Sequence, residues 1–150
     1  MELPDQPGLP EDLAARRLRL LRTELQLSFA EMCHWFESRA SKRGRELTLY
    51  RGRISDWANG GRAIPDWADA IVIRELGTLW RKDRQRMEPG SAALAARDIQ
   101  WASWFDPVLA AYYQVALVTP PEQRPLLEPL REAIFAAFKA RFGFLAPSDS

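Results

Sequence analysis

Residues 51–59 concentrate side chains that make hydrogen bonds and neutralise negative charge. Two guanidinium groups, a hydroxyl, a carboxylate and a carboxamide lie within these nine positions. Such groups can pair with the donors and acceptors that bases present in the major groove of duplex DNA. The polar side of the segment lies opposite its large apolar residues. It consists of Arg51, Gly52, Arg53, Ser55, Asp56 and Asn59.

The spacing of the apolar residues in this segment predicts a helix. Ile54 and Trp57 are three positions apart, so they lie on one stripe while the polar side chains lie on another. Gly60 follows, and glycine commonly ends a helix because it adopts the left-handed conformation without steric cost. Pro65 suits the first turn of a further helix. A short helix with a cationic face fits the major groove, and the alternative is an ordinary solvated surface helix.

A second helix must lie behind this segment to support it. Ser28 and Glu31 form a capping box, in which each side chain pairs with the backbone N–H of the other residue. Met32, Trp35 and Phe36 follow at helical spacing and supply an apolar side. The sequence therefore predicts a helix that begins at Ser28 and packs its apolar side into a core.

Together these two segments resemble the helix-turn-helix of the lambda-repressor/Cro-like (Xre-type) DNA-binding family. The capped helix at residues 28–36 is similar to the second helix of that family. Residues 54–60 match its third-helix pattern Ile-Ser-x-Trp-x-x-Gly, and a basic residue and a proline follow. The resemblance covers roughly residues 13–73 and implies a helical bundle that binds double-stranded DNA.

The chain departs from the family between the two helices. Family members join them by a tight turn, whereas residues 37–47 intervene here. An insertion of about eleven residues equals three helical turns and would extend the second helix in phase, whereas Gly44 favours a loop. In either form the segment carries a basic cluster suited to phosphates beside the groove, the alternative being a solvated basic loop. The cluster consists of Arg39, Lys42, Arg43 and Arg45.

The resemblance also implies roles for single residues. Arg51 would donate two hydrogen bonds to guanine, and Asp56 would accept one from cytosine. Gly52 has no side chain, so one of the family's usual base contacts is missing. The positions implied to face bases are Arg51, Gly52, Ser55 and Asp56. The positions implied to contact phosphates are Ser28, Arg53, Asn59 and Arg62.

Charge is unevenly distributed along the chain. The 150 residues have a formal net charge of +1. Residues 1–14 carry four acidic and no basic side chains, residues 15–86 carry sixteen basic and nine acidic ones, and residues 87–150 carry five basic and seven acidic ones. A basic middle part is expected where a protein meets a polyanion, although the same excess is compatible with simple solubility.

The C-terminal part is predicted to form further helices after a break at residues 87–91. Asp106 and Pro107 predict an N-cap followed by a first-turn proline, and a last helix is expected to end at Gly143. Its apolar face is wider than a surface helix needs, so it packs against either the preceding helices or a second subunit. We expect a homodimer interface there, formed by Leu130, Ile134, Phe135, Phe138 and Phe142.

Other features exclude several functional classes. Residues 1–10 are acidic and rich in proline, which predicts a disordered leader rather than a targeting signal. The chain has no apolar run long enough for a membrane span, so we expect a cytoplasmic location. One cysteine, Cys33, and one histidine, His34, cannot build a zinc site by themselves. We expect no catalysis, metal, cofactor or small-molecule substrate.

The sequence therefore predicts an all-α protein with two parts. Residues 11–86 would form a DNA-binding bundle of the helix-turn-helix (lambda-repressor-like) type, and residues 91–145 a helical hairpin for oligomerisation. The expected function is sequence-specific binding of double-stranded DNA as a dimeric transcriptional repressor of phage or bacterial type. Two alternatives stay open: a structural DNA-binding subunit, such as the small subunit of a phage packaging machine, and a helical protein-interaction adaptor.

Overall fold

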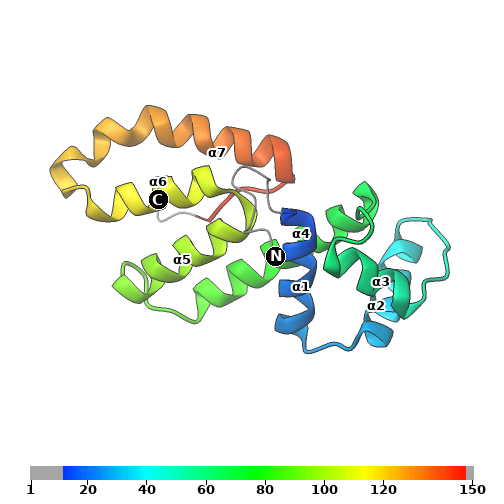
Figure 1. Ribbon diagram of the computed structural model, residues 1–150. Coiled ribbons are helices and arrows are strands. Elements are labelled where there is room, and N and C mark those ends of the chain that lie inside the picture. Colours follow the sequence, from blue (N-terminus) through cyan, green and yellow to red (C-terminus); the bar gives the residue numbers. More distant parts are fainter. Residues whose placement is uncertain (1–11, 148–150) are drawn as a thin grey trace, which may run out of the picture.

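The protein is all-helical, as the sequence predicts (Figure 1). The computed structural model describes residues 12–147, so the predicted leader at residues 1–10 lies outside the described residues. No strand occurs over residues 12–147, and no helix there is long and apolar enough to cross a membrane. The elements are α1 (Leu13–Leu25), α2 (Phe29–Lys42), α3 (Arg51–Asn59), α4 (Asp66–Gln85), α5 (Ala92–Phe105), α6 (Pro107–Val118), the 3₁₀ helix η1 (Pro121–Leu127) and α7 (Glu128–Phe142).

Several helices begin and end at the residues that local signals predict. The Ser28 hydroxyl accepts from the Glu31 backbone N–H at 3.1 Å, and the Glu31 carboxylate accepts from the Ser28 N–H at 2.9 Å. Gly60 ends α3 in the left-handed conformation, with φ of 77°. Asp106 caps α6, whose first residue is Pro107. The predicted start of α2, end of α3 and start of α6 are thus confirmed.

Helices α1, α2, α3 and the first half of α4 enclose an aromatic core. The ring of Phe36 meets the rings of Trp57 and Trp67 edge-on, with centroids 5.9 and 6.3 Å apart. Ile54 is buried beside them. Arg17 is also buried, and its guanidinium group pairs with the Asp69 carboxylate at 3.0 Å, which ties α1 to α4. This core supports α3 from behind.

Helix α4 continues past that bundle and packs against α5. The rings of Trp80 and Trp101 are stacked, with centroids 6.3 Å apart and planes 8° apart. Each indole N–H crosses to a carboxylate on the other helix, from Trp80 to Asp98 at 2.9 Å and from Trp101 to Asp83 at 2.7 Å. We call these four residues the α4–α5 junction. The buried core is continuous across the short turn at residues 87–91.

The last helix packs differently from the predicted interface. Phe135, Phe138 and Phe142 of α7 are buried against aromatic side chains of α5 and α6. These rings therefore belong to the core of the chain in this conformation. Ile134 is partly buried against the same core, and Leu130 remains exposed. An amphipathic helix face alone does not specify which surface covers it.

Candidate nucleic-acid interface

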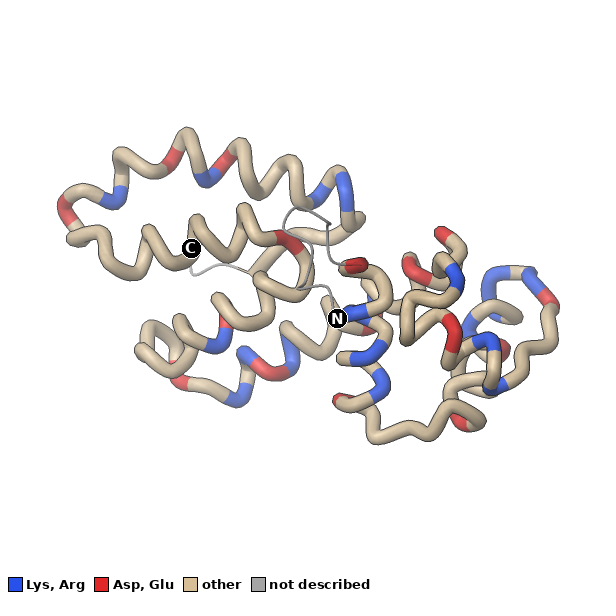
Figure 2. The backbone as a smooth tube through the Cα atoms, in the orientation of Figure 1, with Lys and Arg blue, Asp and Glu red and all other residues tan. Residues whose placement is uncertain are grey.

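Helix α3 turns its apolar side inward and its polar side outward. Ile54, Trp57 and Ala58 are buried, as their spacing predicts. The opposite side carries polar residues that are exposed or partly exposed. We call this set the α3 surface: Arg51, Ser55, Asp56, Asn59 and Arg62. Basic residues also lie along the neighbouring α2–α3 loop (Figure 2).

Contacts within the bundle hold both ends of α3. Near its end, the Arg19 guanidinium donates a hydrogen bond to the carbonyl of Ala58 at 2.6 Å. Before its start, the Leu49 backbone N–H donates to the Glu37 carboxylate on α2 at 2.7 Å. The helix is therefore positioned by hydrogen bonds to α1 and α2 as well as by its buried side chains.

The insertion between α2 and α3 is part helix and part loop. Helix α2 continues to Lys42, and Gly44 then turns the chain in the left-handed conformation with φ of 78°. Residues 45–50 are irregular. Both forms that the sequence left open thus contribute. Lys42 at the end of α2 and Arg43 and Arg45 on the loop are exposed cationic side chains.

Gly52 has a structural role at the start of α3. A Cβ atom at this position would lie 3.2 Å from the ring of Tyr50, so the absent side chain leaves space for that ring. The Arg53 guanidinium lies 5.3 Å from the centroid of the same ring. Tyr50 is itself 55% exposed beside the α3 surface. We add it to the candidate contacts, which the aromatic residue directly before Arg51 could have suggested.

Some of the predicted phosphate contacts already have partners in the fold. Arg39 lies 4.1 Å from the centroid of the Trp35 ring and 3.8 Å from the Glu75 carboxylate. The Ser28 hydroxyl accepts from the Glu31 backbone N–H. The Ser28 backbone N–H in turn donates to the Glu31 carboxylate and, with the Ser28 side chain, holds the pKa of that carboxyl below its usual value. Arg39 and Ser28 therefore make contacts within the fold, whereas Arg43 and Arg45 of the loop are exposed.

The α3 surface contains weak internal contacts between exposed groups. The Arg62 guanidinium lies 3.8 Å from the Asp56 carboxylate, and each side chain is about half exposed. The Asn59 amide donates to the Ser55 hydroxyl at 3.3 Å. Exposed ion pairs contribute little free energy because water screens them, so these groups can exchange partners at small cost.

Cys33 is a free, buried cysteine on α2. Burial raises the pKa of the Cys33 thiol, and the nearby Glu37 carboxylate adds to the effect. A thiol of raised pKa stays protonated and is a poor nucleophile. Residues 12–147 contain no group of three His, Cys, Asp or Glu side chains placed to hold a metal ion.

The fold and this surface define an all-α protein that exposes a short cationic helix. Comparisons with protein-family models, with curated proteins and with solved structures found no match. The likeness to the lambda-repressor/Cro-like family therefore remains a resemblance of motifs, and its implications for function are proposals.

Proposed function

We propose that this protein binds double-stranded DNA in a sequence-specific manner and regulates transcription as a dimeric repressor. The observation that carries the proposal is the orientation of α3. Ile54 and Trp57 anchor the helix in the core, while Arg51 and Asp56 stand exposed on its outer side. A rigid helix with this pattern can enter the major groove and contact base edges.

The α3 surface has groups for both kinds of DNA contact, those to base edges and those to phosphates. Arg51 provides the two donors that guanine O6 and N7 accept, and Asp56 accepts from the amino group of cytosine. Arg62 and Asn59 are placed near the end of the helix, where they would contact phosphates. Lys42 at the end of α2 and Arg43 and Arg45 on the loop extend the cationic surface and would strengthen binding to any sequence.

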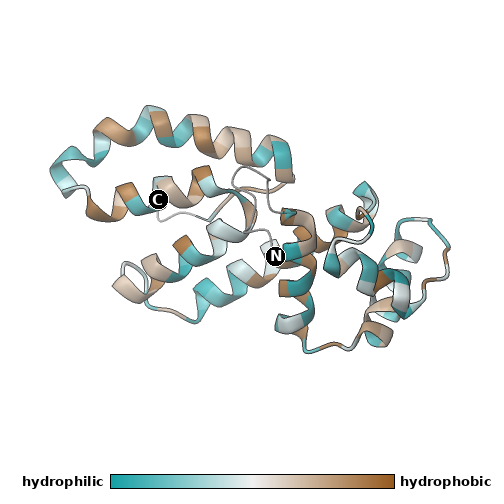
Figure 3. Ribbon diagram, viewed as in Figure 1, coloured by the Kyte–Doolittle hydropathy of each residue, from teal (hydrophilic) through white to brown (hydrophobic). Residues whose placement is uncertain are grey.

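A dimer interface is proposed on α6 rather than on α7. Helix α6 contains no charged residue, and hydrophobic positions recur along it (Figure 3). Residues spaced three, four and three apart form an exposed apolar stripe. Val108 is 59% exposed, Val115 45% and Val118 79%. Leu126 and Leu130 are exposed where η1 joins α6 to α7. The α6 stripe consists of Val108, Ala111, Val115 and Val118.

The absence of charge along the α6 stripe favours a second copy of the chain as its partner. In a two-fold symmetric dimer, the same surface patch meets itself, so a charge near the symmetry axis would lie close to the same charge of the second copy. The α6 stripe avoids that repulsion and removes apolar area from water on pairing. Two α3 helices in one dimer would then contact two half-sites of an operator.

The experiment that tests DNA binding is a salt titration of affinity. We expect wild-type protein to bind duplex DNA with an affinity that falls steeply with salt, because each phosphate contact releases counterions. Arg62→Ala should reduce the slope by about one unit. Arg124→Ala, on the exposed η1 helix at the other end of the molecule, is the matched control and should leave the slope unchanged. No binding at low salt, or a flat salt dependence, would contradict the proposal.

A further inference from the structure

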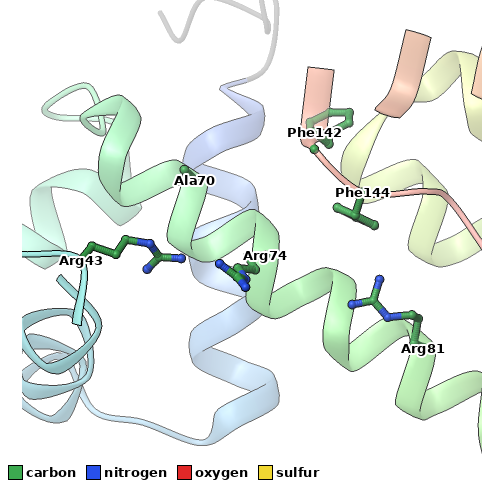
Figure 4. Close-up of a pocket in the computed structure, with 7 residues that line it drawn as sticks. Arg43, Ala70, Arg74, Arg81, Phe142 and Phe144 are labelled. Carbon is green, nitrogen blue, oxygen red and sulfur yellow. The ribbon is translucent and has the colours of Figure 1, made fainter. Parts of the chain in front are cut away.

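A second cationic site lies along α4, outside the α3 surface. It is a cleft of about 530 Å³ between the end of α2, the outer side of α4 and the segment that follows α7 (Figure 4). The residues that line it come from parts of the sequence far from one another. They are Arg43, Ala70, Arg74, Arg81, Phe142, Gly143 and Phe144.

The cleft holds three guanidinium groups and no acidic lining residue. Over residues 12–147, no carboxylate lies within ion-pair distance of Arg43, Arg74 or Arg81. Neighbouring arginines of the same helices do have such partners, since Arg39 pairs with Glu75. Like charges gathered in one concave place repel each other and produce a strong positive potential, which an anion would relieve.

The wall of the cleft depends on a close contact at a glycine. The ring of Phe144 packs so closely on α4 that a Cβ atom at Gly77 would lie 2.9 Å from it. Glycine is a poor helix former, and this one lies inside a twenty-residue helix. The Arg81 guanidinium lies 5.7 Å from the centroid of the same ring. Gly77 therefore lets Phe144 form a fixed apolar wall beside Arg81.

We propose that this cleft binds a small polyphosphate ester of the nucleoside di- or triphosphate class. Arg74 and Arg81 are seven positions apart, which is about 10 Å along a helix. That separation favours a chain of phosphates over a single phosphate group. One guanidinium group can donate two parallel hydrogen bonds to the oxygens of one phosphate. The exposed part of Phe144 offers an apolar surface to the organic part of the ester.

The shape of the site favours a small ligand over the backbone of a duplex. A cleft of this volume falls within the range of about 300–1,000 Å³ that small-molecule sites occupy. All three arginines are exposed, and Arg43 is shared with the proposed DNA surface, whereas Arg74 and Arg81 lie on α4, apart from Arg51 and Ser55 of the α3 surface. The proposal does not depend on DNA binding by α3.

The test is isothermal titration of the full chain with ATP, with inorganic tripolyphosphate and with orthophosphate at constant ionic strength. We expect ATP to bind wild-type protein more tightly than orthophosphate. Arg74→Gln and Arg81→Gln should each weaken ATP binding at least roughly tenfold, since each removes a charged hydrogen-bond donor to phosphate. The matched control is Arg86→Gln, an exposed arginine just past the end of the same helix, which should stay within about twofold of wild type.

Two further measurements separate this site from the α3 surface. Gly77→Ala should displace Phe144 and weaken ATP binding more than tripolyphosphate binding, with circular dichroism as the check that the protein stays folded. Arg74→Gln should keep wild-type affinity for duplex DNA. Absence of ATP binding to wild-type protein, or equal ATP affinity in Arg74→Gln, would overturn the proposal. Parallel loss of duplex and ATP affinity in Arg74→Gln would assign the cleft to the DNA surface and also overturn it.

Discussion

The α4–α5 junction and the α3 surface use the same residue types in opposite ways. At the junction, the Asp98 side chain is 8% exposed, accepts from the Trp80 indole and lies 3.0 Å from the Arg84 guanidinium. At the α3 surface, Asp56 and Arg62 form a longer and half-exposed pair. Burial decides the difference, because a charge taken out of water must keep its partners, whereas an exposed one can exchange them. Ion pairs of the first kind maintain the fold, and those of the second kind remain free to bind.

The largest expected effect comes from removing a carboxylate at the junction. Asp98→Ala would remove a carboxylate that both the Trp80 indole N–H and the Arg84 guanidinium contact. These groups are largely buried, so water would not readily replace the lost carboxylate. Breaking a buried pair in this way lowers the free energy of unfolding by about 3–5 kcal/mol. Urea denaturation measures the change.

The control is the exposed pair of the α3 surface. Asp56→Ala should change the free energy of unfolding by less than about 1 kcal/mol, because water screens an exposed pair. Equal losses in the two variants would show that burial does not separate the junction from the α3 surface.

A smaller change in free energy is expected at the α6 stripe, where a substitution would act on self-association. The stripe is exposed and apolar, unlike the α4–α5 junction and the α3 surface. Val115→Glu would place a charge at the centre of the proposed dimer interface, opposite the same charge of the second copy. We expect self-association to weaken roughly 100-fold, or about 2.8 kcal/mol. Sedimentation over a range of protein concentrations measures it.

The matched variant is Ala136→Glu, which places the same side chain at an exposed position of α7. It should leave the association constant unchanged. A monomeric wild-type protein, or equal loss of association in both variants, would rule out α6 as the interface.

The pH dependence of stability gives a smaller and more specific test of the junction. Burial favours the neutral form of Asp83, but hydrogen bonds from Trp101 and Arg97 outweigh burial and hold the pKa of its carboxyl below the usual value. This carboxylate therefore stabilises the fold at pH values above its pKa in the unfolded chain. The contribution is lost as the pH falls through the lower pKa of the folded protein.

Asp83→Asn should remove this part of the acid dependence. Denaturation midpoints between neutral pH and about pH 2 would fall less steeply in the variant than in the wild type. Asparagine keeps an oxygen that can accept from Trp101, so the variant tests the charge rather than the hydrogen bond. Identical acid dependence in both proteins would show that Asp83 does not stabilise the fold through its charge.

The local parts of the fold could be predicted from the sequence because their causes act within a few residues. The capping box of Ser28 and Glu31 begins α2, and Gly60 ends α3, as their residue types indicate. The division of residues 37–47 could not be decided, because a single glycine at Gly44 is compatible with a loop or a helix end. The structure places the end of α2 just before that residue.

The long-range arrangement could not be predicted by the same reasoning. The apolar face of α7 indicated burial but not its partner, and Phe138 packs against the ring of Phe105 on α5. The cleft was missed because Arg43, Arg74 and Phe144 come from distant parts of the chain. The polar side of α3 was identified because its alternation with Ile54 and Trp57 is a local pattern.

The most direct test of DNA recognition by α3 is a selection of bound sequences from random duplex DNA. Wild-type protein should enrich one short motif. Arg51→Ala should relax that motif at one base position, at a cost of about 1–3 kcal/mol, while Arg62→Ala should weaken all sequences alike. If wild-type protein enriches no motif, or Arg51→Ala enriches the same motif unchanged, α3 is not the element that contacts the bases.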